Sequence, residues 1–195
     1  MAGLFFLYPV LSHLATVLHS DWLAWLALTV FIAVPLLPAL IQRHRSAWLI
    51  LAGGIALLSV CALSGIERYL MFLPPIFIPL SVLMLFARSL RPGQIPIVTR
   101  VALQIRGDMP AELERYTRLI TQCWVVLLIF MASWSLLLAL YATPKFWSLM
   151  TNLVQYLLLA AVFVLEYLFR RLYFRHLQHE SFPAMVVALF RTRMH

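Results

Sequence analysis

The segment Leu119-Ile-Thr-Gln-Cys-Trp-Val-Val-Leu-Leu-Ile-Phe-Met-Ala-Ser-Trp-Ser-Leu-Leu-Leu-Ala-Leu-Tyr-Ala142 contains no charged side chain. As an α-helix rising about 1.5 Å per residue, a segment of this length crosses the roughly 30 Å of hydrocarbon in a lipid bilayer. We therefore expect this segment to be a membrane-spanning helix.

Five more segments are predominantly apolar, and most of the connections between consecutive ones are short: Ala2–Leu18, Trp22–Ile41, Ala47–Ser64, Tyr69–Phe86 and Phe146–Phe169. The sequence therefore predicts an all-α membrane protein of six spans, with residues 1–195 forming a single polytopic domain. The first segment is the shortest, and it carries Pro9, Ser12 and His13. We predict that it spans, and an interfacial or re-entrant helix, which would leave five spans, is the alternative.

The composition supports a membrane protein, because 64% of the residues are hydrophobic and only 11% are charged. Soluble globular chains are about half apolar and about a quarter charged. A water-soluble fold of this size could not bury so much apolar surface. Cys61 and Cys123 lie far apart in apolar segments, which predicts two buried small side chains and neither a disulfide nor a metal site.

The positive charges predict an orientation. No Lys or Arg precedes Arg43, unlike the charged start of a secretory signal peptide. With the N-terminus inside and six spans, thirteen of the fifteen Lys and Arg residues lie on the cytoplasmic side, and only Arg68 and Lys145 lie outside. The positive-inside rule predicts this asymmetry. An Arg-rich loop of residues 87–118 and a basic tail of residues 170–195 are then cytoplasmic, and no nucleic-acid partner is implied.

The loop begins with Phe86-Ala-Arg-Ser-Leu-Arg-Pro-Gly-Gln-Ile-Pro-Ile-Val-Thr-Arg100. Pro92-Gly93 predicts a turn, since Pro presets φ at the second turn position and Gly tolerates positive φ at the third. Pro96 suits the start of a helix. From Ile97 to Ile105 the apolar residues share one face while Arg100 and Gln104 point away, which predicts an amphipathic helix along the membrane surface.

Six arginines in this loop are the leading candidates for function: Arg88, Arg91, Arg100, Arg106, Arg115 and Arg118. A guanidinium binds phosphate or carboxylate bidentately, so the ligand would be a lipid phosphate, a phosphopantetheine arm or an acidic protein. The alternative is that these residues are ordinary topology signals that meet anionic headgroups. The predicted anion, lipid or partner site comprises Arg88, Ser89, Arg91, Gly93, Thr99, Arg100, Arg115, Tyr116 and Arg118.

Several residues are expected to support this site. Glu166 and Arg170 are spaced to pair on one helix face. Pro74, Pro75 and Pro79 should kink the fourth segment and open a groove beside Arg88. His13 is an ionisable group in an apolar segment, and it is either functional or bonded to a neighbouring helix. The other expected interhelical hydrogen-bonding residues are Ser133, Ser135, Asn152 and Gln155.

The string from Phe86 to Arg100 resembles a loop in the small inner-membrane proteins encoded among bacterial aryl polyene and xanthomonadin-type pigment biosynthesis genes. The resemblance covers nearly the whole chain, although Phe174-Arg175 stands where a Pro would follow the Phe. Further matching residues are Tyr8-Pro9 with His13, Pro74-Pro75, Arg115-Tyr-Thr-Arg118 with Trp124, and Glu166-Tyr167 with Arg170-Arg171.

Such proteins are encoded beside acyl carrier proteins and ketosynthases. The resemblance therefore implies a bacterial inner-membrane protein of aryl polyene lipid biosynthesis, without a cofactor, that binds a lipid intermediate or docks acyl carrier protein or other pathway enzymes. Self-association is left open, and a non-enzymatic role is favoured. One alternative is a lipid transport or flipping subunit. The other is an acyl or headgroup transferase whose tempting bases are His13, Glu166, His176 and His179. His176, His179 and Glu180 would share a helix face, but interfacial histidines explain them better than a metal site.

Overall fold

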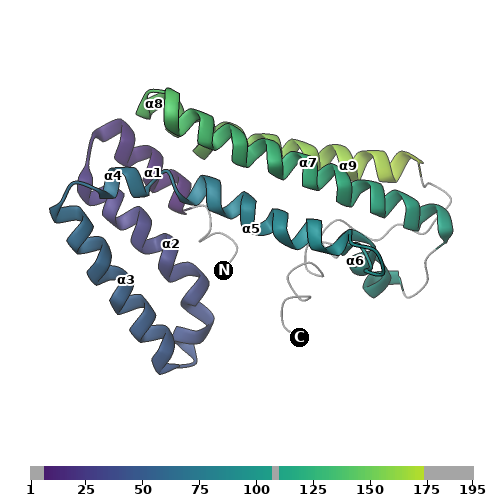
Figure 1. Cartoon of the computed structure of the whole chain (residues 1–195), viewed down its shortest axis with the longest axis horizontal. Coiled ribbons are helices and arrows are strands. Elements are labelled where there is room, and N and C mark those ends of the chain that lie inside the picture. The colour runs from purple at the N-terminus through teal and green to yellow at the C-terminus, as the bar shows by residue number, and fades with distance from the viewer. Residues whose placement is uncertain (1–6, 107–109, 174–195) are drawn as a thin grey trace. The chain divides into compact units, whose positions relative to one another are not determined.

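The computed structural model describes residues 7–106 and 110–173, in which every regular element is a helix (Figure 1). Clustering of the described residues gives two compact units. The first unit comprises residues 7–76 and 134–156, and the second unit comprises residues 77–106, 110–133 and 157–173. The elements are α1 (Leu7–Leu18), α2 (Asp21–Ile41), α3 (Arg45–Leu63), α4 (Glu67–Leu70), α5 (Pro74–Ser89), α6 (Ile97–Arg106), α7 (Ala111–Tyr141), α8 (Pro144–Leu149), the π-helical segment η2 (Met150–Val154) and α9 (Gln155–Tyr173).

Four helices among the described residues are long and apolar enough to cross a membrane. They are α2, α3, α7 and the uninterrupted helix Pro144–Tyr173, which α8, η2 and α9 form together. Each covers one of the segments predicted from apolar runs. Three of them match the predicted ends within four residues, whereas α7 begins at Ala111, eight residues before the predicted start at Leu119. Residues 111–118 of the loop therefore belong to the same helix as this span.

The fourth predicted segment is shorter as a helix, since α5 has 16 residues. The first predicted segment is described only from Leu7, and its 12 described residues form α1. The expectation of one continuous helix over Tyr69–Phe86 is wrong, because α4 ends at Leu70 and α5 begins at Pro74. The expected kink at Pro74 and Pro75 is also wrong. Since proline lacks an N–H group, these two residues occupy the first turn of α5, where no intrahelical donor is required.

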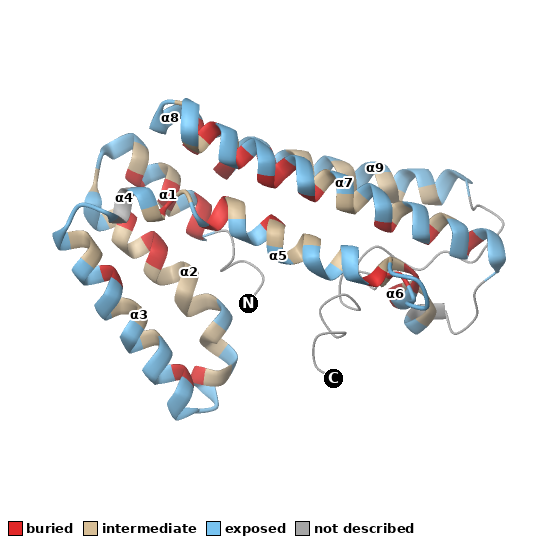
Figure 2. Ribbon diagram, in the orientation of Figure 1, coloured by how far each residue is buried: buried red, intermediate tan, exposed pale blue. Residues whose placement is uncertain are grey.

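Most of the described residues are exposed or only partly buried (Figure 2). Many of the exposed side chains are large and apolar, whereas several of the buried ones are polar. Leu63 is 90% exposed and Leu49 is 73% exposed. Apart from Trp147, the largest fully buried side chains all carry a hydroxyl group: Ser12, Thr99, Thr121, Ser135, Ser148 and Thr151. Water would penalise this distribution, whereas lipid favours it. The chain therefore has the construction of an α-helical membrane protein.

The two cysteines are both free thiols. Cys123 is exposed on α7 and Cys61 is only partly buried. The expectation that both would be buried is therefore wrong, for the same reason that leucines are exposed here. A small apolar side chain gains nothing from leaving a hydrocarbon solvent.

Small residues bring the helices of the first unit together. Ala15 on α1 and Ala24 and Ala27 on α2 are buried, which lets the two backbones approach closely. The turn between these helices is fixed by Ser20, whose hydroxyl oxygen accepts a hydrogen bond of 3.4 Å from the backbone N–H of Leu23. Tyr8 of α1 donates through its hydroxyl to the carbonyl oxygen of Met71 at 3.0 Å. This bond anchors the α4–α5 connection to α1.

Helices α2 and α3 form a hairpin in which one glycine is packed and its neighbour is not. A Cβ atom added at Gly54 would lie 3.3 Å from Cδ1 of Ile32, whereas a Cβ atom at Gly53 would meet nothing within 4 Å. Trp25 adds a polar link, since its indole N–H donates to the hydroxyl oxygen of Ser59 at 3.3 Å. Gly54 is therefore the closest-packed glycine of the hairpin.

This difference predicts opposite effects of the same substitution at neighbouring positions. Both Gly→Leu changes gain about 1 kcal/mol of helix propensity. At Gly54 we expect overpacking against Ile32 to cost about 1–3 kcal/mol, so Gly54→Leu should unfold at a lower temperature than Gly53→Leu. Thermal unfolding of both variants in the same detergent micelles measures the difference. Equal unfolding temperatures would show that α2 and α3 do not pack at Gly54.

Candidate functional site

The turn between α5 and α6 has the predicted geometry. The backbone N–H of Gln94 donates to the carbonyl oxygen of Arg91 at 3.1 Å, which closes a four-residue turn with Pro92 and Gly93 in the middle. Gly93 has φ +77°, a conformation that other residues rarely adopt. This turn reverses the chain directly after α5.

Ser89 holds this turn together from the end of α5. Its side chain is buried, and its hydroxyl donates to the carbonyl oxygen of Phe86 at 2.7 Å. The same oxygen accepts the backbone N–H of Ile97 at 3.1 Å. Because Ile97 is the first residue of α6, Ser89 satisfies a donor that the helix itself leaves unpaired. Ser89 is a member of the predicted anion site, but its hydroxyl forms these two bonds within the protein and stabilises the turn.

Helix α6 is amphipathic, as predicted. Val101 is buried, while Arg100 and Gln104 are exposed. Thr99 is also buried, with its hydroxyl 2.8 Å from the hydroxyl of Thr117 on α7. Thr117 donates its own proton to the carbonyl oxygen of Glu114 at 3.0 Å, so Thr99 is the donor in the pair. Thr99 therefore attaches α6 to α7.

Aromatic rings connect three helices of the second unit. The ring of Trp124 on α7 lies 6.2 Å from that of Phe86 on α5 and 4.6 Å from that of Phe163 on α9, measured between centroids. Such tilted arrangements are favourable for aromatic quadrupoles. The loop helix α6 is thus attached to a framework of α5, α7 and α9.

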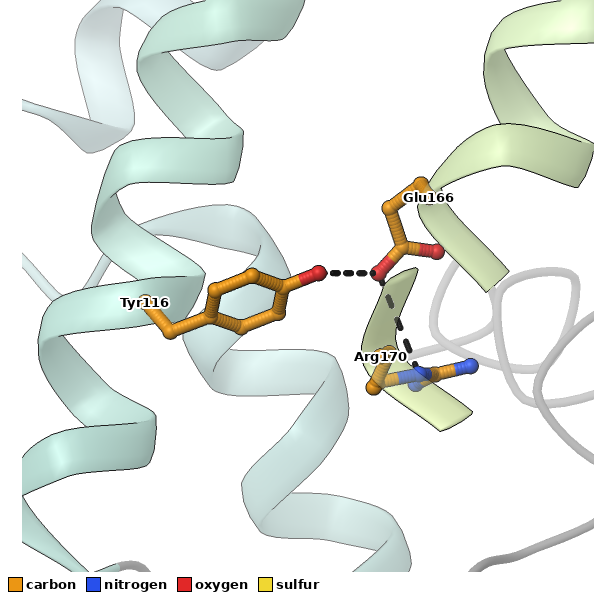
Figure 3. Close-up of polar contacts among 3 residues, drawn as sticks. All are labelled: Tyr116, Glu166 and Arg170. Carbon is orange, nitrogen blue, oxygen red and sulfur yellow. Dashed lines mark hydrogen bonds and ion pairs between the residues drawn. The ribbon is translucent and has the colours of Figure 1, made fainter. Parts of the chain in front are cut away.

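Tyr116 connects the start of α7 to the end of α9 (Figure 3). Its hydroxyl donates to Oε1 of Glu166 at 3.3 Å, and its ring stacks on Phe169 with centroids 5.8 Å apart. Arg170 places Nε 3.8 Å from the same carboxylate oxygen, which confirms the predicted Glu166–Arg170 pair. The hydrogen bond to Tyr116 was not predicted, because 50 residues separate the partners in sequence.

The arginines of the loop remain on the surface of the second unit. None of the exposed ones forms an ion pair with a described residue. The side chain of Arg106 lies outside the described part of the structure. The five exposed residues are Arg88, Arg91, Arg100, Arg115 and Arg118.

The hydrogen bonds of Ser89, Thr99 and Thr117 constrain the backbone from which four of these arginines extend. Arg88 and Arg91 flank the segment held by Ser89. Arg100 follows Thr99, and Arg118 follows Thr117, so the Thr99–Thr117 bond brings their backbones together. The five exposed arginines therefore extend from α5, the α5–α6 turn, α6 and α7, all of which belong to the second unit.

The first unit contains a separate polar network. Nδ1 of His13 lies 3.1 Å from the hydroxyl oxygen of Ser148, so the predicted bond from His13 to another helix is confirmed. Asn152 donates through Nδ2 to Ser12 at 3.2 Å and to Ser148 at 3.1 Å. Ser12 and Ser148 were not predicted. The signal that could have found them is their spacing, since Ser12 precedes His13 and Ser148 lies one helical turn before Asn152.

A second polar pair of the first unit joins α7 to α9. Gln155 donates through Nε2 to the hydroxyl oxygen of Ser135 at 2.9 Å, and both side chains are buried. The predicted interhelical bonding of Ser135, Asn152 and Gln155 is therefore confirmed. The expectation for Ser133 is wrong, because its side chain is exposed on α7.

Part of the predicted chemistry lies outside the described residues. This applies to His176, His179 and Glu180, and to Arg175, Arg191 and Arg193 of the basic tail. Within residues 7–106 and 110–173, no group of three or more His, Cys, Asp or Glu side chains is placed to hold a metal ion.

Comparisons with known proteins give no relative. No family model matches this chain, and no curated protein or solved structure matches it either.

The attachment of α6 to α7 is testable through its hydroxyl pair. Thr99→Val keeps the shape of the side chain but removes the donor to Thr117, so α6 should open more often. We expect amide hydrogen exchange in residues 97–104 to accelerate about 5–10-fold, in line with the loss of one buried hydrogen bond. Thr121→Val is the control, because that hydroxyl bonds only to the carbonyl oxygen of Thr117 in its own helix. Equal exchange of α6 in both variants would contradict the assignment.

Proposed function

We propose that the chain is a six-spanning protein of the bacterial inner membrane that binds an anionic group through its Arg-rich loop. The ligand is the phosphate or carboxylate of a lipid intermediate, or an acidic acyl carrier protein that docks at the cytoplasmic face. The pathway is aryl polyene lipid biosynthesis, to which the resemblance of Phe86–Arg100 points. A non-enzymatic binding or docking role is the preferred form of the proposal.

One observation carries this proposal. Five exposed arginines, none paired with a described residue, extend from a backbone that Ser89 and the Thr99–Thr117 bond hold in place. Arginines that act only as topology signals would not require a defined turn. A fixed backbone reduces the conformational entropy lost when several guanidinium groups converge on one anion.

The proposed orientation rests on the distribution of charge. Arg43 and Arg45 at the α2–α3 turn are exposed, as are Arg88, Arg91, Arg100, Arg115 and Arg118. Because two proposed spans, α3 and α5, separate these two groups, both lie on the same side of the membrane, which the positive-inside rule makes the cytoplasmic side. The remaining two spans would be formed by the short apolar helices α1 and α5.

A transferase is the second candidate function, and the pairing of His13 with Ser148 favours it. A histidine nitrogen 3.1 Å from a serine oxygen is the arrangement that activates a hydroxyl nucleophile. However, the hydroxyl oxygen of Ser148 also accepts a hydrogen bond from Nδ2 of Asn152 at 3.1 Å, so this oxygen is already engaged by two side chains. The other described base, Glu166, is bonded to Tyr116 and Arg170. We therefore place binding before catalysis.

The first experiment compares what two purified proteins retain. Native mass spectrometry of the wild type, extracted with native lipids, should detect a bound phosphate-bearing lipid or an acyl carrier protein. The triple variant Arg91→Gln, Arg100→Gln, Arg118→Gln should lose at least about tenfold of this occupancy, since each charge-assisted bond contributes about 1.5–3 kcal/mol.

The matched control is Arg43→Gln, Arg45→Gln, which removes exposed arginines of the same predicted membrane side but leaves the loop intact. This variant should retain the ligand. If both variants and the wild type carry only the same bulk phospholipid, the loop arginines are topology signals and the binding proposal is wrong.

Topology is tested by labelling single cysteines in a background with Cys61→Ala and Cys123→Ala. A membrane-impermeant thiol reagent should label Lys145→Cys from outside the inner membrane. Gln94→Cys and Gly3→Cys should be labelled only after the membrane is opened, since the loop and the N-terminus are proposed to be cytoplasmic. Labelling of Gly3→Cys from outside would reduce the number of spans to five without changing the other helices.

A further inference from the structure

Two buried polar atoms of the first unit lack a partner, one in Asn152 of the polar network and one in Trp147, which directly precedes Ser148 in the chain. Oδ1 of Asn152 and Nε1 of Trp147 make no hydrogen bond with any described residue. Asn152 is 8% exposed and Trp147 is 1% exposed, so bulk solvent does not reach these atoms easily. Buried polar atoms without partners are rare in proteins, and each requires an explanation. In hydrocarbon the penalty is larger, because no solvent molecule can compensate.

The unpaired end of Asn152 does not depend on how its carboxamide is oriented. Nδ2 lies near the hydroxyl oxygens of Ser12 and Ser148. If the two ends were exchanged, these hydroxyls would donate to the oxygen and the NH₂ group would be unpaired. One end of the carboxamide therefore lacks a protein partner in both orientations.

A local change of helix geometry places Asn152 in this position. Residues Met150–Val154 form a π-helical turn, in which the backbone N–H of Gln155 donates to the carbonyl oxygen of Met150 five residues earlier. Such turns are less stable than α-helix and recur at functional sites. Here the turn carries Asn152 within reach of Ser12 on α1 and Ser148 on α8 at the same time.

Apart from His13, the network contains no ionisable side chain. No Asp, Glu, Lys or Arg side chain takes part in the described hydrogen bonds of Ser12, Ser148 and Asn152. An anionic or cationic ligand would therefore lack an acidic or basic partner of this kind in a medium of low dielectric constant. His13 is only partly buried, and exposed apolar side chains lie close to the network residues in sequence: Val10, Leu14, Leu149 and Leu153. A ligand would reach the network through lipid.

We infer that the network of Ser12, His13, Trp147, Ser148 and Asn152 binds the hydroxyl group of a neutral membrane lipid. A hydroxyl can accept from the indole N–H of Trp147 or donate to Oδ1 of Asn152, and it leaves no net charge in the hydrocarbon. The acyl chains of such a lipid would lie against the exposed apolar side chains of α1 and η2. This inference does not depend on the Arg-rich loop, which belongs to the second unit.

A photoreactive diacylglycerol tests the inference, because it is neutral and has one free hydroxyl group. The full chain is reconstituted in vesicles of phosphatidylethanolamine and phosphatidylglycerol that contain the probe, and the labelled peptides are identified by mass spectrometry. We expect labelling of α1 and of residues 144–156. Unlabelled diacylglycerol should compete, whereas its deoxy analogue, in which hydrogen replaces the hydroxyl group, should not, because it can neither donate nor accept at that position.

Two variants remove the proposed partners of the hydroxyl. Asn152→Leu deletes the carboxamide, and Trp147→Phe deletes the indole N–H while keeping a ring beside Phe72, which lies 4.5 Å from Trp147 between centroids. Each should lower the specific labelling about 5–10-fold. Thr151→Val is the matched control, because that buried hydroxyl bonds to the carbonyl oxygen of Trp147 in its own helix. This variant should be labelled like the wild type.

Each remaining outcome would overturn the inference. Equal competition by diacylglycerol and by its deoxy analogue would show that the hydroxyl is not recognised. Equal labelling of the wild type and of Trp147→Phe would assign the unpaired atoms to water or to the protein alone. Trp147→Phe changes packing least, so it decides the test if Asn152→Leu does not fold. Loss of anion binding at the loop would leave these results unaffected.

Discussion

The structure depends on one constraint: a polar side chain within hydrocarbon must find its hydrogen-bond partner inside the protein. Two solutions occur among the described residues. Thr121 and Thr151 donate to carbonyl oxygens one turn earlier in their own helices. Ser12 and Ser135 instead bond to amide side chains of other helices. The consequence is an interior rich in hydroxyl groups and a surface of leucine, valine and phenylalanine, the reverse of a soluble protein.

The same constraint determines what holds the helices together. Lipid tails are as apolar as leucine, so burial of leucine provides little driving force for helix association. Close approach at small residues and a few polar bonds provide it instead. In the first unit these are Ala24, Ala27 and the bonds of Asn152. In the second unit the bond between Thr99 and Thr117 has this role. Each of these bonds therefore contributes a large share of the small free energy that holds the helices together.

In the Arg-rich loop, residues that stabilise the backbone alternate along the sequence with exposed arginines. Ser89 and Thr99 point into the protein and stabilise the turn and α6. The arginines beside them remain exposed and are free to meet an external anion. Tyr116 belongs to the stabilising group, because it bonds to Glu166 across two helices. The arginines are therefore the proposed binding residues, and the other members of the predicted site are proposed to act by positioning them.

The sequence alone determined the helical class, four long apolar helices, the Pro92-Gly93 turn and the amphipathic α6, because each depends on local composition or on residues a few positions apart. It missed the break in the fourth segment, where α4 ends at Leu70 and two adjacent prolines begin α5. Only the tertiary structure decided the partners of His13, Asn152 and Tyr116. Those bonds join residues that lie 50 to 140 positions apart. Such pairings depend on how helices face each other, and an apolar run contains no record of that orientation.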